Sequence, residues 1–282
     1  MDREVVLVVL ALCVCGPLAV ACGAVRTEHA SIASGGALER FWWRRLWFPL
    51  LPSLTVLSLL LGWALQEPDA SDEGLRVHLF VIALPFALIW ARATGRAVWA
   101  LRRQRSAAPV ETIGLWRPQI RISPTFAATV DGPVLAAAHA HELAHGQHRD
   151  PLRIWLGQWA SDLQWPGPAT ARRWREWRWA LELARDDEAR ARGVDGADLA
   201  AAIVAAAQVC VRPVAPAAGL VGEAAALAAR VDRLLRPLPP EISRERTRWP
   251  GVALVALVVL TSCTLGVLYG EQVLRAIPGV GG

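Results

Sequence analysis

Two histidines and a glutamate near the middle of the chain have the types and the spacing of a zinc site. Residues 141–145 read His-Glu-Leu-Ala-His. On an α-helix, residues four positions apart lie on one face, about 6 Å apart along the axis, so the imidazoles of His141 and His145 can bind one zinc ion at roughly 2.0–2.1 Å. Glu142 can then accept a proton from a water that the metal activates. A catalytic zinc usually has a third protein ligand and one open position. The motif supplies only two ligands, so we expect a third elsewhere in the chain.

The surrounding sequence favours a helix that ends soon after this motif. Residues 136–144 are rich in helix-forming residues, and Asp150-Pro151 follows as a break. His148 lies seven residues after His141, roughly 10.5 Å further along a straight helix, which is too far to bind the same ion. His139 points to another face. We expect both to be solvated or to support the ligands. The alternative to a metal site is a surface helix with two unrelated histidines.

The best candidate for the third ligand lies further along the chain. Glu182 and Asp186 are four residues apart and therefore share a helix face. Glu182 would complete a site of two histidines and one glutamate. Asp186 would accept a hydrogen bond from the other ring nitrogen of a ligand histidine and fix its tautomer. Asp187 and Glu188 fall off this face, where substitution should have little effect. The alternative is an exposed helix with surface charge pairs.

Together these segments resemble the BlaR/MecR-type antirepressor metallopeptidases, bacterial membrane proteins of the gluzincin group. The resemblance covers about residues 110–240. The elements that carry it are H-E-L-A-H at 141–145, the pair Arg149-Asp150, the Trp/Pro stretch at 165–168, E-x-x-x-D at 182–186 and R-V-D-R-L-L at 230–235. The commoner form of the family has Cys immediately before the aspartate, where this chain has Arg185. The more distant HtpX-like membrane proteases use the same kinds of ligand.

The resemblance implies a mainly α, polytopic membrane protein with an α-rich, minor-β, gluzincin-like zinc peptidase domain and one Zn²⁺ per chain. The residues carried over are the ligands His141, His145 and Glu182, the catalytic Glu142, the supporting Asp186, and Arg230 as a candidate for stabilising the transition state. For Arg230 the alternative is a surface arginine. The expected reaction is hydrolysis of a protein substrate, such as a cytoplasmic transcriptional repressor, in signal transduction. The alternatives are an HtpX-like quality-control protease and a non-catalytic membrane signalling scaffold.

The source of the activating signal is a separate question. The β-lactam sensors of this family carry a large extracellular penicillin-binding domain after the last span. Here residues 271–282 follow the fourth apolar run. We therefore expect the stimulus to come through the spans, the short loops or a separate sensor protein.

Composition indicates a modest soluble domain together with membrane spans, because the 282 residues are 54% hydrophobic with a formal charge of +5. We predict a transmembrane region over 1–104 with spans at about 5–25, 46–66 and 77–93, a zinc peptidase domain over 105–247, and a fourth span with a short outer tail over 248–282. A signal peptide is the alternative for the first run, and a buried or interfacial helix for the short third run. The five cysteines form no disulfide framework.

The distribution of the arginines sets the expected orientation. The first loop carries Arg26, Arg40, Arg44 and Arg45, whereas the loop at 67–76 is acidic with one arginine at its end. Further arginines follow the third run and precede the fourth, namely Arg92, Arg96, Arg102, Arg103, Arg105, Arg244, Arg246 and Arg248. Since positively charged loops stay in the cytoplasm, we expect the domain at 105–247 to be cytoplasmic, at the bacterial inner membrane.

Two further patterns bear on the domain. Arginines alternate with tryptophans over 172–179, which can indicate binding of single-stranded nucleic acid. Trp174, Trp177 and Leu181 form one stripe of a helix, however, so we expect an amphipathic helix and no direct contact with nucleic acid.

The alternation of apolar and polar residues over 119–123 predicts a short strand.

Overall fold

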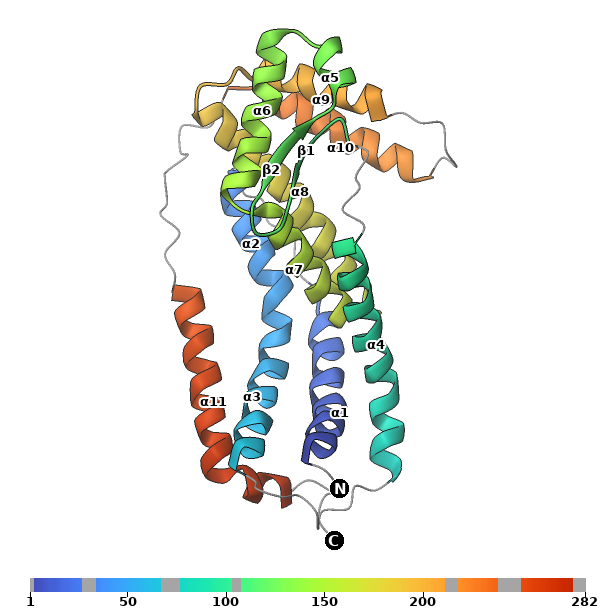
Figure 1. The fold of residues 1–282 in the computed structure, drawn as a ribbon, viewed down its shortest axis with the longest axis vertical. Helices are drawn as coiled ribbons and strands as arrows, with labels where there is room; N and C mark the ends of the chain where they lie inside the picture. The colour runs from blue at the N-terminus through green and yellow to red at the C-terminus, as the bar shows by residue number, and fades with distance from the viewer. Residues whose placement is uncertain are drawn as a thin grey trace.

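The computed structural model describes residues 3–26, 34–66, 77–102, 108–210, 218–237 and 250–275, and these are mainly helical. Figure 1 shows an elongated molecule with long helices in its lower part, and further helices and a small β hairpin in its upper part. The prediction of a mainly α protein with a minor β component is confirmed.

Within the described residues, three helical stretches are long and apolar enough to cross a membrane: Glu4–Ala24, Gly35–Gln66 and Val77–Leu101. The first is α1 (Arg3–Ala24) and the third is α4 (Val77–Arg102). The second is a continuous run of α2 (Gly35–Trp47), the 3₁₀ turn η1 (Phe48–Leu50) and α3 (Leu51–Gln66). The first three predicted spans are therefore present as helices of sufficient length. The second of them begins well before residue 46, since α2 precedes it without a break.

Helix α4 is longer than the span predicted at 77–93. Arg92 was expected to bound a short apolar run, but the helix continues to Arg102. Arg92 lies within the helix, and its guanidinium pairs at 3.3 Å with the carboxylate of Asp162 on α7 (Asp150–Leu163). The side chains of Val81 and Leu88 are exposed on the surface of α4, as expected of a helix that contacts lipid.

Helix α11 (Pro250–Arg275) lies beside α3 at the place of the predicted fourth span (Figure 1). The apolar stretch Val255–Gly270 is shorter than the other three, so this crossing stays a prediction. The end of the predicted outer tail (276–282), the acidic loop at 67–76 and five of the arginines used to assign the orientation lie outside the described residues, namely Arg103, Arg105, Arg244, Arg246 and Arg248.

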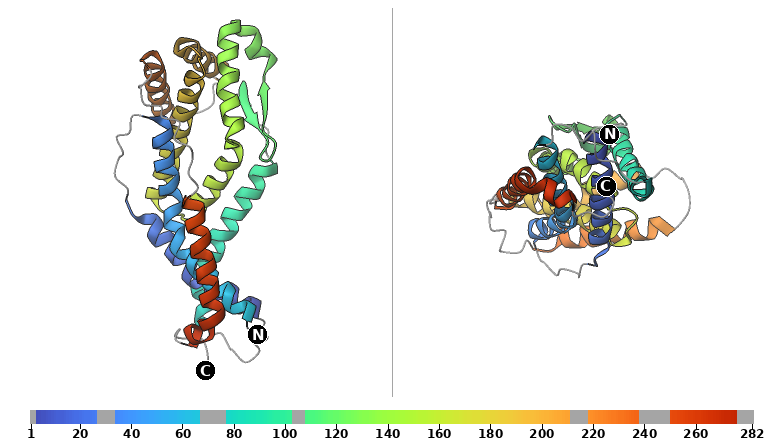
Figure 2. Two further views of the ribbon diagram at one scale, coloured as in Figure 1. Left: turned by 90° about the vertical axis from the view of Figure 1, so that its left-hand side faces the viewer. Right: turned by 90° about the horizontal axis from the view of Figure 1, so that it is seen from below.

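The upper part of the molecule holds the predicted peptidase segment. It consists of the antiparallel strands β1 (Val110–Ile113) and β2 (Gln119–Ile122), followed by α5 (Pro124–Thr129), α6 (Gly132–Gln147), α7, α8 (Pro168–Ala191), α9 (Gly196–Cys210) and α10 (Ala218–Leu235). The strand predicted at 119–123 is confirmed, and β1 is its partner. The hairpin lies along one side of α6 (Figure 2).

Helices α2 and α8 join the two parts of the molecule. Their contact buries Trp42 on α2 together with Trp177 and Leu181 on α8, and Trp174 packs against the same cluster. The predicted apolar stripe of α8 is therefore confirmed. A Cβ atom on Gly35 would lie 2.6–2.7 Å from backbone atoms of α8, so the two helices touch backbone to backbone at this point.

The N-terminal half of α8 is fixed to the end of α1. Arg173 is 1% exposed and donates hydrogen bonds to the carbonyl oxygens of Gly23 (2.6 Å) and Val25 (2.9 Å). The Thr170 hydroxyl also donates to Gly23 (3.1 Å). The last carbonyls of a helix have no partner within it, so these bonds satisfy groups that would otherwise be costly to bury.

The close contact at Gly35 yields a test of the fold. Gly35→Ala should destabilise the protein by about 1–3 kcal/mol, because the added methyl group meets the backbone of α8, which cannot move aside cheaply. The measurement is the thermal unfolding midpoint in detergent.

The matched control is Gly36→Ala, whose Cβ would come no closer than 3.6 Å to any neighbour. Alanine is the better helix former, so this variant should be as stable as the parent or slightly more so. Equal midpoints for the two variants would contradict the packing of α2 on α8 described above.

Candidate metal centre

The turn between α6 and α7 places the first supporting carboxylate. Helix α6 ends at Gln147, Arg149 adopts the left-handed conformation (φ 52°), and α7 begins at Asp150 with Pro151 in its first turn. This reversal brings Asp150 back against the preceding helix, where its Oδ2 lies 2.9 Å from Nδ1 of His145. Asp150 is fully buried.

The three predicted ligands converge. Their ligand atoms, from His141, His145 and Glu182, all lie within 4.8 Å of one another. The two Nε2 atoms are 3.1 Å apart, and the Glu182 oxygens lie 3.5 Å from the first and 3.8 Å from the second. Ligand atoms of a tetrahedral zinc ion are about 3.3 Å apart, since each bond is roughly 2.0–2.1 Å. The donor set and its spacing therefore fit a zinc ion.

Each histidine has a carboxylate at its other ring nitrogen. Asp150 stands at Nδ1 of His145, and Asp186 stands 3.0 Å from Nδ1 of His141. The Asp186 contact is close, but its direction does not meet the geometry of a hydrogen bond. Carboxylates in this position fix the tautomer of a ligand histidine and leave Nε2 for the metal. The structure thus places Asp186 where it was expected, and reveals Asp150 as its counterpart.

Asp150 is the centre of a buried ionic network that the sequence analysis did not identify. It accepts hydrogen bonds from Nη2 of Arg185 (3.2 Å) and from Arg153 (3.0 Å), in addition to its contact with His145. Arg185 of α8 is 3% exposed. An isolated buried carboxylate would be strongly destabilising, so these cations are required by the burial of Asp150.

The same contacts shift the protonation of the pair. Burial alone would lower the pKa of His145, but the bond to Asp150 and the nearby Glu182 outweigh it and raise the pKa to about 9. Burial would raise the pKa of Asp150, yet its bonds to His145 and Arg185 hold it well below its usual range. These contacts favour the protonated form of His145 and the ionised form of Asp150, and a metal ion bound at His145 would displace its proton.

Arg230 of α10 reaches the cluster, as the family element predicted. Its Nη1 lies 3.0 Å from Glu182, its Nη2 donates to Asp186 at 2.8 Å, and Nη2 also lies 3.3 Å from Nε2 of His141. Burial would raise the pKa of Glu182, but Arg230 and the two histidines hold it well below its usual range. The alternative of a surface arginine is wrong, because the Arg230 side chain is 13% exposed.

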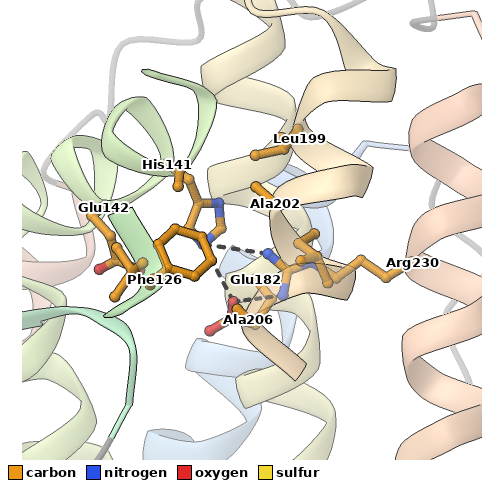
Figure 3. Close-up of a pocket in the computed structure, with 11 residues that line it drawn as sticks. Phe126, His141, Glu142, Glu182, Leu199, Ala202, Ala206 and Arg230 are labelled. Atoms are coloured by element: carbon orange, nitrogen blue, oxygen red, sulfur yellow. Dashed lines mark hydrogen bonds and ion pairs between the residues drawn. The ribbon is translucent and has the colours of Figure 1, made fainter. Parts of the chain in front are cut away.

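Glu142 lies beside the ligands at the wall of a pocket of about 160 Å³. The hydroxyl of Thr112 on β1 is 2.8 Å from a carboxylate oxygen of Glu142 and 2.8 Å from its carbonyl oxygen, and can donate to one of them at a time. Figure 3 shows Glu142 and Arg230 on opposite sides of the pocket, with His141 and Glu182 between them. Its other walls are apolar and come from Val110, Phe126, Ala138, Leu199, Ala202, Ile203 and Ala206.

The remaining predicted residues lie away from the ligand atoms. His139 is exposed, and His148 pairs with Glu188 at 2.9 Å. Asp187 lies away from the ligand atoms, as expected, but its side chain is only 4% exposed, so the small effect expected of its substitution on the metal stays a prediction. It accepts a hydrogen bond from the backbone N–H of Gly35 (2.9 Å) and pairs with Arg233. Sequence periodicity placed Asp187 off the metal-facing stripe but could not show that α2 covers that side of α8.

Comparison with known proteins does not identify the chain. No protein-family model, curated protein or solved structure matches it. The geometry of the cluster and the resemblance of its sequence elements therefore carry the functional assignment.

The geometry predicts metal binding by named residues. The protein purified in detergent should hold about one zinc ion per chain, because three ligands of suitable type converge. His141→Ala and His145→Ala should each remove it, and Glu182→Ala should remove or strongly weaken it, as measured by elemental analysis after dialysis.

The matched control is His139→Ala, which changes an exposed histidine of the same helix and should retain the zinc. Full zinc content in a His141→Ala/His145→Ala double variant would rule out this site.

Proposed function

We propose that the chain is a membrane-embedded zinc metalloendopeptidase that hydrolyses a protein substrate. The observation that carries this proposal is the convergence of His141, His145 and Glu182, with Glu142 next to them and a carboxylate at Nδ1 of each histidine. A cluster of three ligands alone is compatible with a structural metal. The adjacent glutamate at the wall of a pocket favours a catalytic site.

Glu142 is the proton carrier of the proposed reaction. A zinc ion bound at the cluster would polarise the substrate carbonyl and lower the pKa of a water. Glu142 then accepts a proton from that water and passes it to the departing amine. The Thr112 hydroxyl, 2.8 Å from the carboxylate, limits the positions that Glu142 can adopt. Arg230 lies at the edge of the ligand cluster, where its guanidinium can stabilise the negative charge that develops on the carbonyl oxygen.

The position of the site favours a substrate outside the bilayer. Helices α6, α8 and α10 bring the ligands and Arg230 together in the upper part of the molecule, above α1, α3 and α4 and level with the first turn of α2 (Figure 1). The distribution of arginines favours a cytoplasmic location for this part, at the bacterial inner membrane. A cytoplasmic protein such as a transcriptional repressor is therefore the substrate class that we propose, in keeping with the sequence resemblance.

A substitution of the base separates catalysis from metal binding. Glu142→Gln should keep its zinc and lose turnover by several orders of magnitude, because the variant retains the ligands and removes the proton carrier. We would compare new protein N-termini in cells that express the parent or this variant. Cleavage products present with the parent and absent with the variant would identify the substrate.

Identical sets of N-termini in the two strains would instead favour a non-catalytic signalling scaffold. Loss of zinc from Glu142→Gln would show that this residue has a structural role and is not the base.

Orientation is tested by labelling single cysteines in intact cells, with the five native cysteines replaced. A cysteine at Gln119, which is exposed on β2, should react with an impermeant thiol reagent only after the cells are opened. A cysteine at Asp72, in the acidic loop of the sequence, should react from outside. The reverse pattern would exclude a cytoplasmic substrate.

A further inference from the structure

Helix α2, at the start of the second candidate span, carries a buried carboxylate. Glu39 is 6% exposed and pairs with the guanidinium of Arg153 on α7. The same guanidinium donates to Oδ1 of Asp150 at 3.0 Å, and Oδ2 of Asp150 lies 2.9 Å from Nδ1 of His145. A continuous series of polar contacts therefore runs from α2 to a predicted metal ligand.

Helix α2 fixes the position of Arg153 from two sides. Glu39 holds the guanidinium edge, and the ring of Trp43, one turn further along α2, lies under its face with the Arg153 Cζ 5.0 Å from the ring centre. Arginine is suited to this role, because its planar group can bridge two carboxylates and stack on an aromatic ring at once. A shift of α2 would therefore move Arg153, or break its bond to Glu39 and leave a buried carboxylate without its cation.

The first turn of α2 is also linked to the other histidine, His141. The backbone N–H of Gly35 donates to Asp187 at 2.9 Å. The neighbouring Asp186 stands at His141. Both carboxylates that support the histidines are thus connected to the same helix, Asp150 through Arg153 and Asp186 through the adjacent residue of α8.

Helix α2 continues into a candidate membrane span without a break. Residues Gly35–Gln66 form one helical run of 32 residues through η1 into α3. Movement of this span along or around its axis can therefore reach α2 through η1. Helix α4 also contacts α7, where Nε1 of Trp155 donates a hydrogen bond to the carbonyl oxygen of Ala97 at 2.9 Å. The buried Asp162 on α7 joins Arg92 and Arg96 of α4, and this contact lies at the opposite end of α7 from Asp150.

We propose that Glu39 and Arg153 are positioning residues that couple the membrane span α3 to the metal site, by holding Asp150 against His145. The inference rests on the proposed zinc site and adds its regulation. A displacement of the span changes the orientation of His145 and so alters the affinity and ligand geometry of the metal. In this proposal, the element that transmits the signal is α3 of the protein itself.

The test changes Glu39, which is remote from the ligands, and measures the metal affinity and ligand geometry of the site. Glu39→Gln removes the charge and keeps the volume of the side chain. In the purified full-length chain it should lower zinc affinity about 10-fold in competition with a chelator, the lower end of the range for groups that support a ligand histidine. The cobalt-substituted protein should show altered visible absorption bands, because these report the geometry of the metal's ligands. A merely structural role would change stability and leave the bands in place.

A double-variant cycle tests whether Glu39 acts on the metal site through Arg153. In an Arg153→Met background, Glu39→Gln should have no further effect on zinc affinity, since the connection is already cut. The matched control is Asp162→Asn, which removes a buried carboxylate from the same helix α7 and should leave zinc affinity and the cobalt bands unchanged. If Glu39→Gln does not fold, Arg153→Lys tests the same link, because lysine keeps the charge but lacks the planar fork that bridges two carboxylates.

The outcomes separate this inference from the proposed function. Zinc affinity and cobalt bands that match the parent in Glu39→Gln or Arg153→Lys would overturn the coupling and leave the zinc site intact. Equal changes with Asp162→Asn would also overturn it, since the effect would then be one of general stability. Absence of zinc and cobalt binding by the parent protein would overturn both.

Discussion

The burial of carboxylates around two histidines is the constraint on which the rest of the structure depends. Asp150, Asp186 and Asp187 are each less than 5% exposed. Charged groups can be buried at this depth only when they are paired and hydrogen-bonded. Most of the necessary cations come from other helices: Arg185 of α8 pairs with Asp150 of α7, and Arg230 and Arg233 of α10 pair with Asp186 and Asp187 of α8. Arg153 is the exception, since it lies on α7 with Asp150. The charges of the site therefore determine which helices must meet there.

This requirement explains the arrangement of the upper helices. The motif helix α6 supplies the two imidazoles, α8 supplies Glu182 and two carboxylates, and α10 supplies the arginines that neutralise them. Helix α2 closes the remaining side of α8 through the contact at Gly35 and the buried Trp42. Because α2 is continuous with a candidate span, the candidate metal centre and the candidate spans are connected through the same helix.

Local spacing made the convergence of the candidate ligands predictable from sequence. His141, Glu142 and His145 follow from the helical period, and Glu182 with Asp186 follows from the same period on a second helix. The polar network around them was not predictable in this way. Asp150 acts through a left-handed turn at Arg149, and Glu39 meets Arg153 across 114 positions of the chain. No local pattern reports such contacts. The pairing of Arg92 with Asp162 was not predictable for the same reason, since these residues are 70 positions apart.

The central claim is that one zinc ion is bound through Nε2 of two histidines and a carboxylate, and X-ray absorption at the zinc edge tests it most directly. The account predicts a shell of nitrogen and oxygen neighbours at roughly 2.0–2.1 Å with the outer scattering of two imidazoles. The same spectrum of the Glu142→Gln protein should be closely similar, because that residue is not a ligand. A sulfur shell near 2.3 Å, or the scattering of fewer than two imidazoles, would contradict the account.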